Sequence, residues 1–218
     1  TRSPTTRRRA RAMHRTHFSA FGYGSLVNRR TLDGGARTIP GRIAGYRRAW
    51  RAASSWHGHG VCALSIEPCP DGTTIRGLLV TEPVRRLPAL DAREKHYNRH
   101  ELPAAVFAPE AEAHPHGPVD DTFFLYRASA DVNVWGDATN PVWLSYVDTV
   151  AQGFHDLWGP EGVEHFVATT DGWWIPIVDD RDAPAYPRAA ALTQREKDVV
   201  DAALAAAGAR RVALADLA

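Results

Sequence analysis

The chain has 218 residues, of which 44% are hydrophobic and 23% are charged, and its formal net charge at pH 7 is +1. A mean hydropathy of −0.34 is typical of an ordinary globular protein, and this length is enough for one domain with a sizeable core. The near-neutral charge gives no general case for a nucleic-acid or membrane partner. No apolar run approaches the roughly 18 residues of a membrane span.

The two cysteines, Cys62 and Cys69, predict free thiols. If residues 61–67 are extended, the chain separates the two by up to about 23 Å, whereas a disulfide needs Cα atoms within about 7 Å. Two free thiols indicate a reducing compartment, and no signal peptide with an apolar core precedes the first predicted strand. We therefore expect a cytoplasmic protein.

The chain divides into three segments by composition. Six arginines lie within residues 1–15, and we expect a basic, disordered tail over 1–17. Residues 18–185 form the predicted main domain, and residues 186–218 form a predicted C-terminal helical extension.

The first apolar run, residues 17–21, predicts a β-strand that ends in the loop Tyr23-Gly24-Ser25-Leu26. Glycine in such a loop lets a ligand approach the main chain closely, and successive N–H groups can converge on an anion or a carbonyl oxygen. The loop is neither a dinucleotide fingerprint nor a nucleophile elbow, because Val27 and Tyr23 stand where those motifs need glycine. A turn without function is the other interpretation.

Apolar runs and turn residues predict the remaining strands. These strands cover residues 42–50, 61–67, 74–81, 98–107, 121–127 and 171–177, with the second and third joined by a turn at 68–72 and the fourth and fifth forming a pair. Helical spacing predicts helices over 86–97, 141–158 and 193–207, with 162–169 continuing the second. Thr193 caps the last helix and Gly208 ends it.

The helix predicted over 86–97 carries an acidic residue on its apolar face. Leu87, Leu90, Glu94 and Tyr97 share this face because residues three and four apart stack. A carboxylate there is costly unless it is paired or neutral. Desolvation raises its pKa toward the range that suits proton transfer near pH 7. The alternative, which spacing leaves open, is that Glu94 points to solvent and pairs with a neighbouring basic residue.

Three segments stand out together: Phe21-Gly22-Tyr23-Gly24-Ser25-Leu26, then Leu90-Asp91-Ala92-Arg93-Glu94 with Tyr97-Asn98-Arg99, and Tyr146 followed by Gly153. Together they resemble the γ-glutamylcyclotransferase family over about residues 18–170. The chain departs from that family at Lys95, where many members have glycine, and at Leu26, where some have asparagine. Both departures concern the choice of substrate more than the reaction.

The resemblance implies an α+β fold, with a small mixed sheet curled toward a barrel and helices packed outside. It implies an enzyme that cyclises a γ-glutamyl amide to 5-oxoproline and releases the free amine. Glu94 would be the general acid/base, Tyr23, Gly24, Ser25 and Leu26 would supply N–H donors, and Tyr97 and Tyr146 would orient the substrate or Glu94. No metal or cofactor is implied, and the expected partner is a small γ-glutamyl substrate. The amine half and the oligomeric state stay open.

Two other functions remain as alternatives. One is a non-catalytic small-molecule-binding domain of the same fold. The other is a serine hydrolase that uses Ser25 with His57 and Asp91, for which only the residue types speak. The histidine pairs at 57/59 and 114/116 lack carboxylate or cysteine neighbours at ligand spacing, so we interpret them as loop residues.

Overall fold

The computed structural model of the chain describes residues 16–32, 34–56, 58–110 and 120–217. Most of the predicted tail, together with His57, His114 and His116, lies outside these residues. Within the described residues, no helix is both long enough and apolar enough to cross a membrane.

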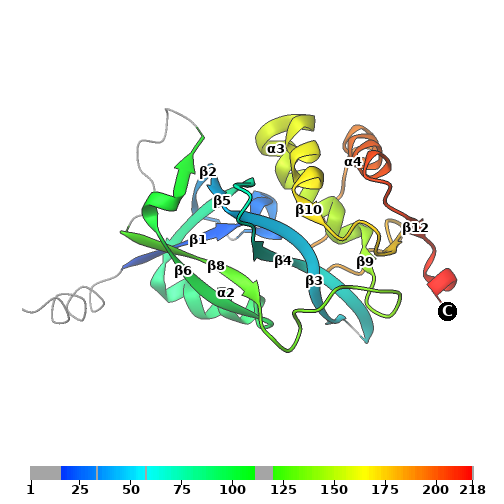
Figure 1. The fold of residues 1–218 in the computed structure, drawn as a ribbon, viewed down its shortest axis with the longest axis horizontal. Helices are drawn as coiled ribbons and strands as arrows, with labels where there is room; N and C mark the ends of the chain where they lie inside the picture. Colours follow the sequence, from blue (N-terminus) through cyan, green and yellow to red (C-terminus); the bar gives the residue numbers. More distant parts are fainter. Residues whose placement is uncertain (1–15, 33, 57, 111–119, 218) are drawn as a thin grey trace, which may run out of the picture.

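The largest sheet has six strands in the order β6-β8-β1-β5-β2-β7 (Figure 1). Their bounds are β1 His17–Gly22, β2 Arg37–Ala44, β5 Thr74–Pro83, β6 Tyr97–Pro103, β7 Phe107–Pro109 and β8 Thr122–Ala128. Strand β1 pairs antiparallel with β5 and parallel with β8, so the sheet is mixed. The α+β class and the mixed sheet agree with the prediction. The described strands nevertheless form open sheets and not a barrel, because β6 and β7 remain edge strands.

Two smaller sheets complete the β structure. One has the order β10-β3-β4 and the other β12-β11-β9. Their bounds are β3 Tyr46–Trp56, β4 His59–Pro68, β9 Val142–Trp143, β10 Thr170–Asp171, β11 Ile177–Val178 and β12 Arg211–Val212.

Three strand predictions need correction. The single strand predicted over 42–50 is wrong, because Gly45 (φ 81°) turns the chain between β2 and β3. The strand predicted over 171–177 is also wrong: Gly172 (φ 100°) begins a turn that buries Trp173 and leaves Trp174 exposed. The segments over 61–67 and 74–81 are strands, but they lie in different sheets. The pair over 98–107 and 121–127 exists as β6 and β8, although β6 stops at Pro103.

Helices α2 (Leu87–Arg93), α3 (Leu144–Ala168) and α4 (Gln194–Ala206) lie outside the sheets. Short 3₁₀ helices are η1 Ser25–Val27, η2 Arg29–Thr31, η3 Val84–Arg86, η4 Ala104–Val106 and η5 Leu214–Leu217. The two segments predicted over 141–158 and 162–169 join across a kink at Gly159 (φ 64°) and Pro160. Thr193 caps α4 in a capping box, as predicted.

The helix predicted over 86–97 is too long. It ends at Arg93, the Glu94 N–H closes the last turn on the Leu90 carbonyl (3.0 Å), and Tyr97 already begins β6. Glu94 and Tyr97 therefore share no helix face. Whatever brings Glu94 inward is the tertiary fold and not helical spacing.

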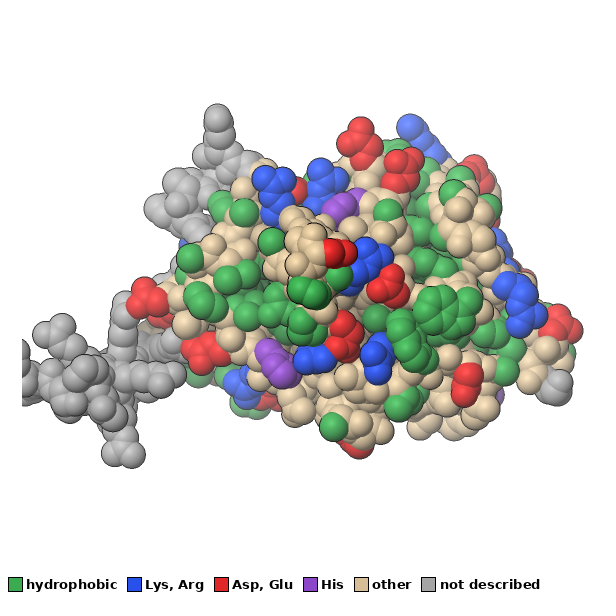
Figure 2. All heavy atoms as spheres, in the orientation of Figure 1, with side chains coloured by type: hydrophobic (Ala, Val, Ile, Leu, Met, Phe, Trp, Pro, Cys, Tyr) green, Lys and Arg blue, Asp and Glu red, His purple; other side chains and the backbone are tan. Residues whose placement is uncertain are grey.

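One main core joins the large sheet, β3, β4 and α3. Its largest fully buried side chains include Phe21, Trp50, Leu64, Phe154 and Phe166. The last thirty or so residues also contribute, through Tyr186, Val200, Ala203 and Leu204. Cys62 and Cys69 are both free thiols, as expected. On the face drawn in Figure 2, acidic and basic side chains are interspersed around patches of hydrophobic ones.

Candidate active site

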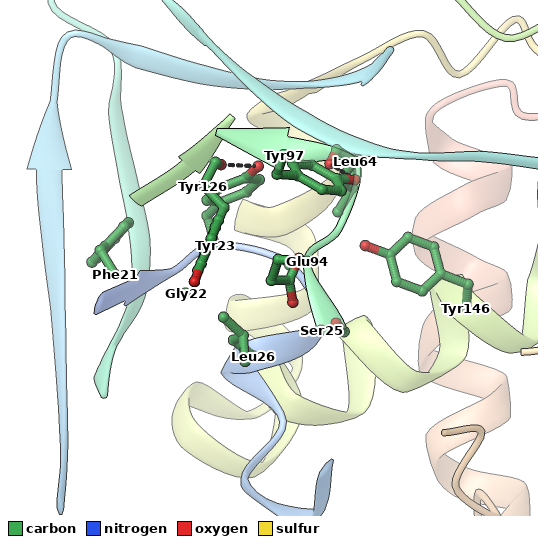
Figure 3. Close-up of a pocket in the computed structure, with 11 residues that line it drawn as sticks. Phe21, Gly22, Tyr23, Ser25, Leu26, Leu64, Glu94, Tyr97, Tyr126 and Tyr146 are labelled. Atoms are coloured by element: carbon green, nitrogen blue, oxygen red, sulfur yellow. Dashed lines mark hydrogen bonds between the residues drawn. The ribbon is translucent and has the colours of Figure 1, made fainter. Parts of the chain in front are cut away.

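A hollow lies where β1 ends, between the large sheet, β4 and the start of α3 (Figure 3). It is lined by all seven residues that the resemblance implies for the site: Tyr23, Gly24, Ser25, Leu26, Glu94, Tyr97 and Tyr146. The other lining residues are Phe21, Gly22, Leu64 and Tyr126. Segments far apart in the chain thus meet at one place.

The loop between β1 and η1 presents main-chain N–H groups. The Val27 N–H is the first of η1 to donate inside the turn, to the Gly24 carbonyl (2.9 Å). The N–H groups of Ser25 and Leu26 come before it and, as at any helix start, have no acceptor within the helix. A Cβ on Gly24 would lie 3.2 Å from the Tyr146 hydroxyl, so glycine keeps the loop open toward that side chain.

Hydrogen bonds from the Arg48 side chain hold this loop in place. The residue is fully buried in β3, and its Nε donates to the Tyr23 carbonyl (2.7 Å). Its Nη1 donates to the Thr169 hydroxyl (2.6 Å), and its Nη2 donates to the Arg76 carbonyl. In a trans peptide the C=O and N–H point in opposite directions. Because Arg48 holds the Tyr23 carbonyl, the Gly24 N–H points away from Arg48.

Glu94 is held at the bend between α2 and β6. Its side chain is only 15% exposed, and one carboxylate oxygen lies 3.3 Å from Nε of Arg93, itself 11% exposed. Burial raises the pKa of the Glu94 carboxyl above its ordinary value, and the charges of Arg93 and Arg188 offset part of that rise. The carboxyl group is therefore both desolvated and paired with a basic neighbour. The sequence alone leaves these two states, a buried carboxyl group and a paired one at the surface, as alternatives.

Four tyrosines surround the carboxyl group. The Tyr23 hydroxyl donates to the Tyr126 carbonyl (2.6 Å), and the Tyr97 hydroxyl donates to the Leu64 carbonyl (2.8 Å). Burial is the main cause that raises the pKa of Tyr23, Tyr97, Tyr126 and Tyr146, and the charge of Glu94 adds to it. All four phenols are therefore protonated at neutral pH.

Tyr146 is positioned by the start of α3. The preceding Ser145 N–H donates to Asp180 (2.7 Å), a buried carboxylate that caps this helix end. Two turns further on, Gly153 lets α3 approach η1, since a Cβ there would lie 2.5 Å from the Asn28 main-chain nitrogen. The buried Asn28 side chain donates to the Thr149 carbonyl (2.8 Å). Tyr146 and Gly153 therefore both lie where α3 packs against η1 and the loop that precedes it.

Sequence reasoning missed several residues of the site. Tyr126 lies on β8 and donates to Asp91 (2.7 Å), which pairs with Arg99 (2.6 Å). The only local signal for Tyr126 in the sequence is its position two residues after Phe124 in a predicted strand. Leu64 takes part through its carbonyl group, which side-chain patterns do not reveal. Arg48 is one arginine among many and carries no signal in the sequence.

The residues proposed for a serine hydrolase do not assemble among the described part of the chain. The Ser25 hydroxyl accepts a hydrogen bond from Nη2 of Arg93 (3.1 Å), and no described histidine bonds to it. Asp91 is engaged with Tyr126 and Arg99. His57 lies outside the described residues.

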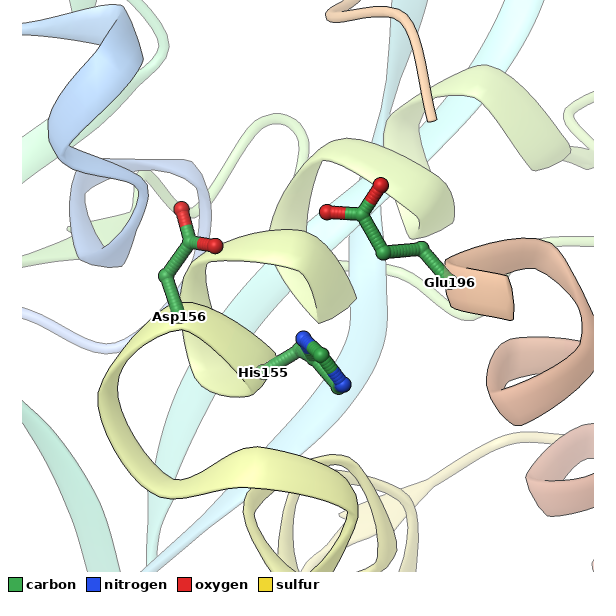
Figure 4. A group of neighbouring side chains, drawn as sticks. All are labelled: His155, Asp156 and Glu196. Atoms are coloured by element: carbon green, nitrogen blue, oxygen red, sulfur yellow. The ribbon is translucent and has the colours of Figure 1, made fainter. Parts of the chain in front are cut away.

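A separate group, His155, Asp156 and Glu196, joins α3 to α4 (Figure 4). Their possible ligand atoms lie within 4.8 Å of one another. Arg30 already pairs with Asp156 (2.9 Å) and with Glu196 (3.7 Å), and Glu196 also closes the capping box of α4. The Arg30 guanidinium thus supplies the positive charge beside these carboxylates. We interpret the group as part of the packing between α3 and α4.

No known family model and no curated protein matches this sequence. Several solved structures superpose on most of the chain. One, described as a gamma-glutamyl cyclotransferase, has a TM-score of 0.52 and 15% identity, and covers 85% of this chain and 99% of its own. The chain has the fold of that enzyme. An uncharacterized protein from Homo sapiens gives a TM-score of 0.53 at 16% identity, with the same coverage.

Proposed function

We propose that the chain is a γ-glutamylcyclotransferase-type enzyme, which converts a γ-glutamyl amide into 5-oxoproline and a free amine. The observation that carries the proposal is one hollow that is lined both by a desolvated carboxyl group, Glu94, and by the loop Tyr23-Gly24-Ser25-Leu26. The likeness of fold to a gamma-glutamyl cyclotransferase supports it.

The reaction needs no nucleophile from the protein. Glu94 takes a proton from the α-ammonium of the substrate, and the freed amine attacks the γ-carbonyl carbon. The oxygen of the tetrahedral intermediate gains negative charge, which the N–H groups of Ser25 and Leu26 stabilise. Glu94 then returns the proton to the amide nitrogen, the C–N bond breaks as the carbonyl re-forms, and the departing amine takes up the extra proton of the ring nitrogen, which leaves neutral 5-oxoproline and an ammonium product.

The raised pKa of Glu94 suits this exchange. Because burial raises this pKa, the carboxyl group binds a proton more tightly than a solvated glutamate does, which helps it to keep the proton between the two transfers. The charge of Arg93, 3.3 Å away, offsets part of the rise in the pKa and favours the ionised carboxylate.

The test uses Glu94→Gln, which keeps the size of the side chain but cannot carry a proton. Release of 5-oxoproline from γ-glutamyl amides should fall by roughly 10²-fold or more, while ligand affinity measured by calorimetry is retained. Glu82→Gln is the matched control, because Glu82 is also close to Arg93 but lines a different hollow. Wild-type turnover in a folded Glu94→Gln variant would exclude Glu94 as the shuttle. Binding by the wild type without 5-oxoproline would favour the non-catalytic alternative.

A further inference from the structure

A second hollow, of about 190 Å³, lies between the large sheet, η2 and α2. Much of its lining is apolar and buried, and comes from Ala20 of β1, Leu26 of η1, Val80 of β5 and Leu90 of α2. An apolar cavity of about 150 Å³ can hold benzene, so this hollow has room for a ligand of roughly six to ten non-hydrogen atoms. Among the described residues it shares only Leu26 with the hollow that holds Glu94, and we call it the α2 hollow.

Four charged side chains complete the lining of the α2 hollow: Glu82, Arg86, Arg93 and Arg188. Arg93 is already engaged, because it donates to the Thr31 carbonyl (3.0 Å) and to the Ser25 hydroxyl (3.1 Å). Its Nε also lies 3.3 Å from the Glu94 carboxylate. Arg93 therefore belongs to the wall between the two hollows, and the other three charged groups decide what the α2 hollow can bind.

Glu82 is a shielded carboxyl group that lacks a hydrogen bond. Its side chain is only 12% exposed, and it accepts no hydrogen bond from the described residues. The Arg86 Nε lies 3.7 Å from one of its oxygens, which is too far for a hydrogen bond. Burial raises the pKa of Glu82, and the charge of Arg93 offsets part of that rise. A ligand that donates N–H groups would replace the hydration that burial removes.

Glu82 and Arg86 present a negative and a positive group side by side. In an α-amino acid the ammonium nitrogen and the carboxylate carbon are two bonds apart, about 2.5 Å. Such a zwitterion can therefore place its ammonium group at Glu82 and its carboxylate at the neighbouring Arg86. Arg188 is exposed and forms no ion pair with a described carboxylate, so its charge adds to the attraction for the carboxylate of the ligand.

We propose that the α2 hollow is a binding site for a free α-amino acid with an apolar side chain. The ammonium group of the ligand donates to Glu82, its carboxylate accepts from Arg86, and its side chain lies on the apolar lining. A simple amine or a simple carboxylate satisfies only one half of the Glu82–Arg86 pair. The site is separate from the hollow that holds Glu94, and it does not rest on the proposed function.

Calorimetry on the full chain tests the proposal with L-leucine and three analogues. The first analogue, 4-methylpentanoate, lacks the ammonium group, and the second, 3-methylbutylamine, lacks the carboxylate. The third, glycine, lacks the apolar side chain. Leucine should bind with a stoichiometry of one, and at least roughly tenfold more tightly than each analogue, because each loses one of the three contacts.

Variants locate the ligand in the α2 hollow. Glu82→Gln and Arg86→Gln should each weaken the binding of leucine by roughly tenfold or more. Glu94→Gln makes the same change in the other hollow and should leave the affinity for leucine within about twofold. Arg85→Gln, an exposed arginine beside Arg86 that does not line the α2 hollow, should likewise have no effect. Arg86 is partly exposed, so its variant provides the test even if Glu82→Gln does not fold.

Three results would overturn the proposal. The first is the absence of leucine binding up to about 10 mM. The second is equal affinity for leucine and for 4-methylpentanoate or 3-methylbutylamine, which would make the hollow a site for a simple anion or a simple cation. The third is a loss in Glu94→Gln as large as that in Arg86→Gln, which would place leucine in the hollow that holds Glu94.

Discussion

Arg48 connects three parts of the molecule through one planar group. Its guanidinium reaches the loop after β1, the end of α3 and strand β5, at the Tyr23 carbonyl, the Thr169 hydroxyl and the Arg76 carbonyl. It also lies over the ring of Phe154, 4.8 Å from the centroid. A lysine ammonium cannot reproduce this fork.

We therefore expect Arg48→Lys to lower the free energy of unfolding by roughly 1–3 kcal/mol. The 5-oxoproline rate should also fall through kcat more than through KM, because the N–H groups move away from the position of the developing charge. Denaturant unfolding and steady-state kinetics check both. Arg47→Lys is the control, because Arg47 is the neighbouring residue and is partly exposed in its pair with Asp171. It should change neither the free energy of unfolding nor kcat. A stability loss with unchanged kcat would make Arg48 merely a core residue.

Glu94 should lower the stability of the fold as the pH rises. Its folded pKa is raised above 4.5 by burial, so the folded protein binds the proton more tightly than the unfolded chain. The resulting stability is fully present below about pH 4.5 and is lost as pH rises through the folded value. The Tm of Glu94→Gln should therefore rise relative to that of the wild type as the pH is raised from about 4.5 to neutrality. A constant difference in Tm across that range would contradict this.

At the scale of elements, the contact of α3 with η1 fixes both sides of the hollow, because one carries Tyr146 and the other carries Ser25 and Leu26. Gly153 makes the contact possible: a Cβ would meet main-chain atoms of Val27 and Asn28 at 2.5–2.8 Å. Main chain cannot yield as a flexible side chain can.

Gly153→Ala should accordingly cost about 1–3 kcal/mol of stability through overpacking and should weaken binding of γ-glutamyl ligands. Urea unfolding and calorimetry measure the two effects. Gly34→Ala is the control, since a Cβ there meets nothing within 4 Å, and its effect should stay within about 0.5 kcal/mol. Equal behaviour of the two variants would mean that α3 can shift without consequence.

Local chemistry made some elements predictable and tertiary packing hid others. The loop after β1 and the cap at Thr193 depend on glycine and hydroxyl residues in their own segments, and both could be read from the sequence. The helix over 86–97 was overextended because its apolar spacing continues to Tyr97, while the fold pairs Tyr97 with Ala128 in β6 and β8. Glu94 lies in the hollow because of that bend, a reason that helical spacing could not supply.

Across the whole molecule, the C-terminal segment is part of the same core as the sheet. Tyr186 packs edge-on against Tyr146, with ring centroids 4.9 Å apart, and Leu204 is buried in the main cluster. Arg181 pairs with Asp148 of α3 (2.7 Å). The position of α4 therefore depends on α3, as does that of Tyr146.

His165 should make the whole fold sensitive to acid. Its Nε2 accepts the Arg76 N–H (3.0 Å), and burial, with the charges of Arg48 and Arg76, lowers its pKa from 6.5 to about 4. The unfolded chain thus takes up this proton first, and the stability that neutral His165 supports is lost as the pH falls from about 6.5 to 4. His165→Gln, which keeps an acceptor, should flatten the fall of Tm over this range. Parallel curves for the two proteins would contradict the assignment.

The ring of Trp50 lies at the centre of the core with its centroid 5.9 Å from that of Tyr146 and 5.3 Å from that of Trp173. Tyr146 lines the hollow that holds Glu94, so a molecule that enters it changes the surroundings of an aromatic ring in direct contact with a buried indole. We expect the intrinsic emission of Trp50 to change in intensity on ligand binding. The protein would then report occupancy of its own site optically, without a label and without turnover.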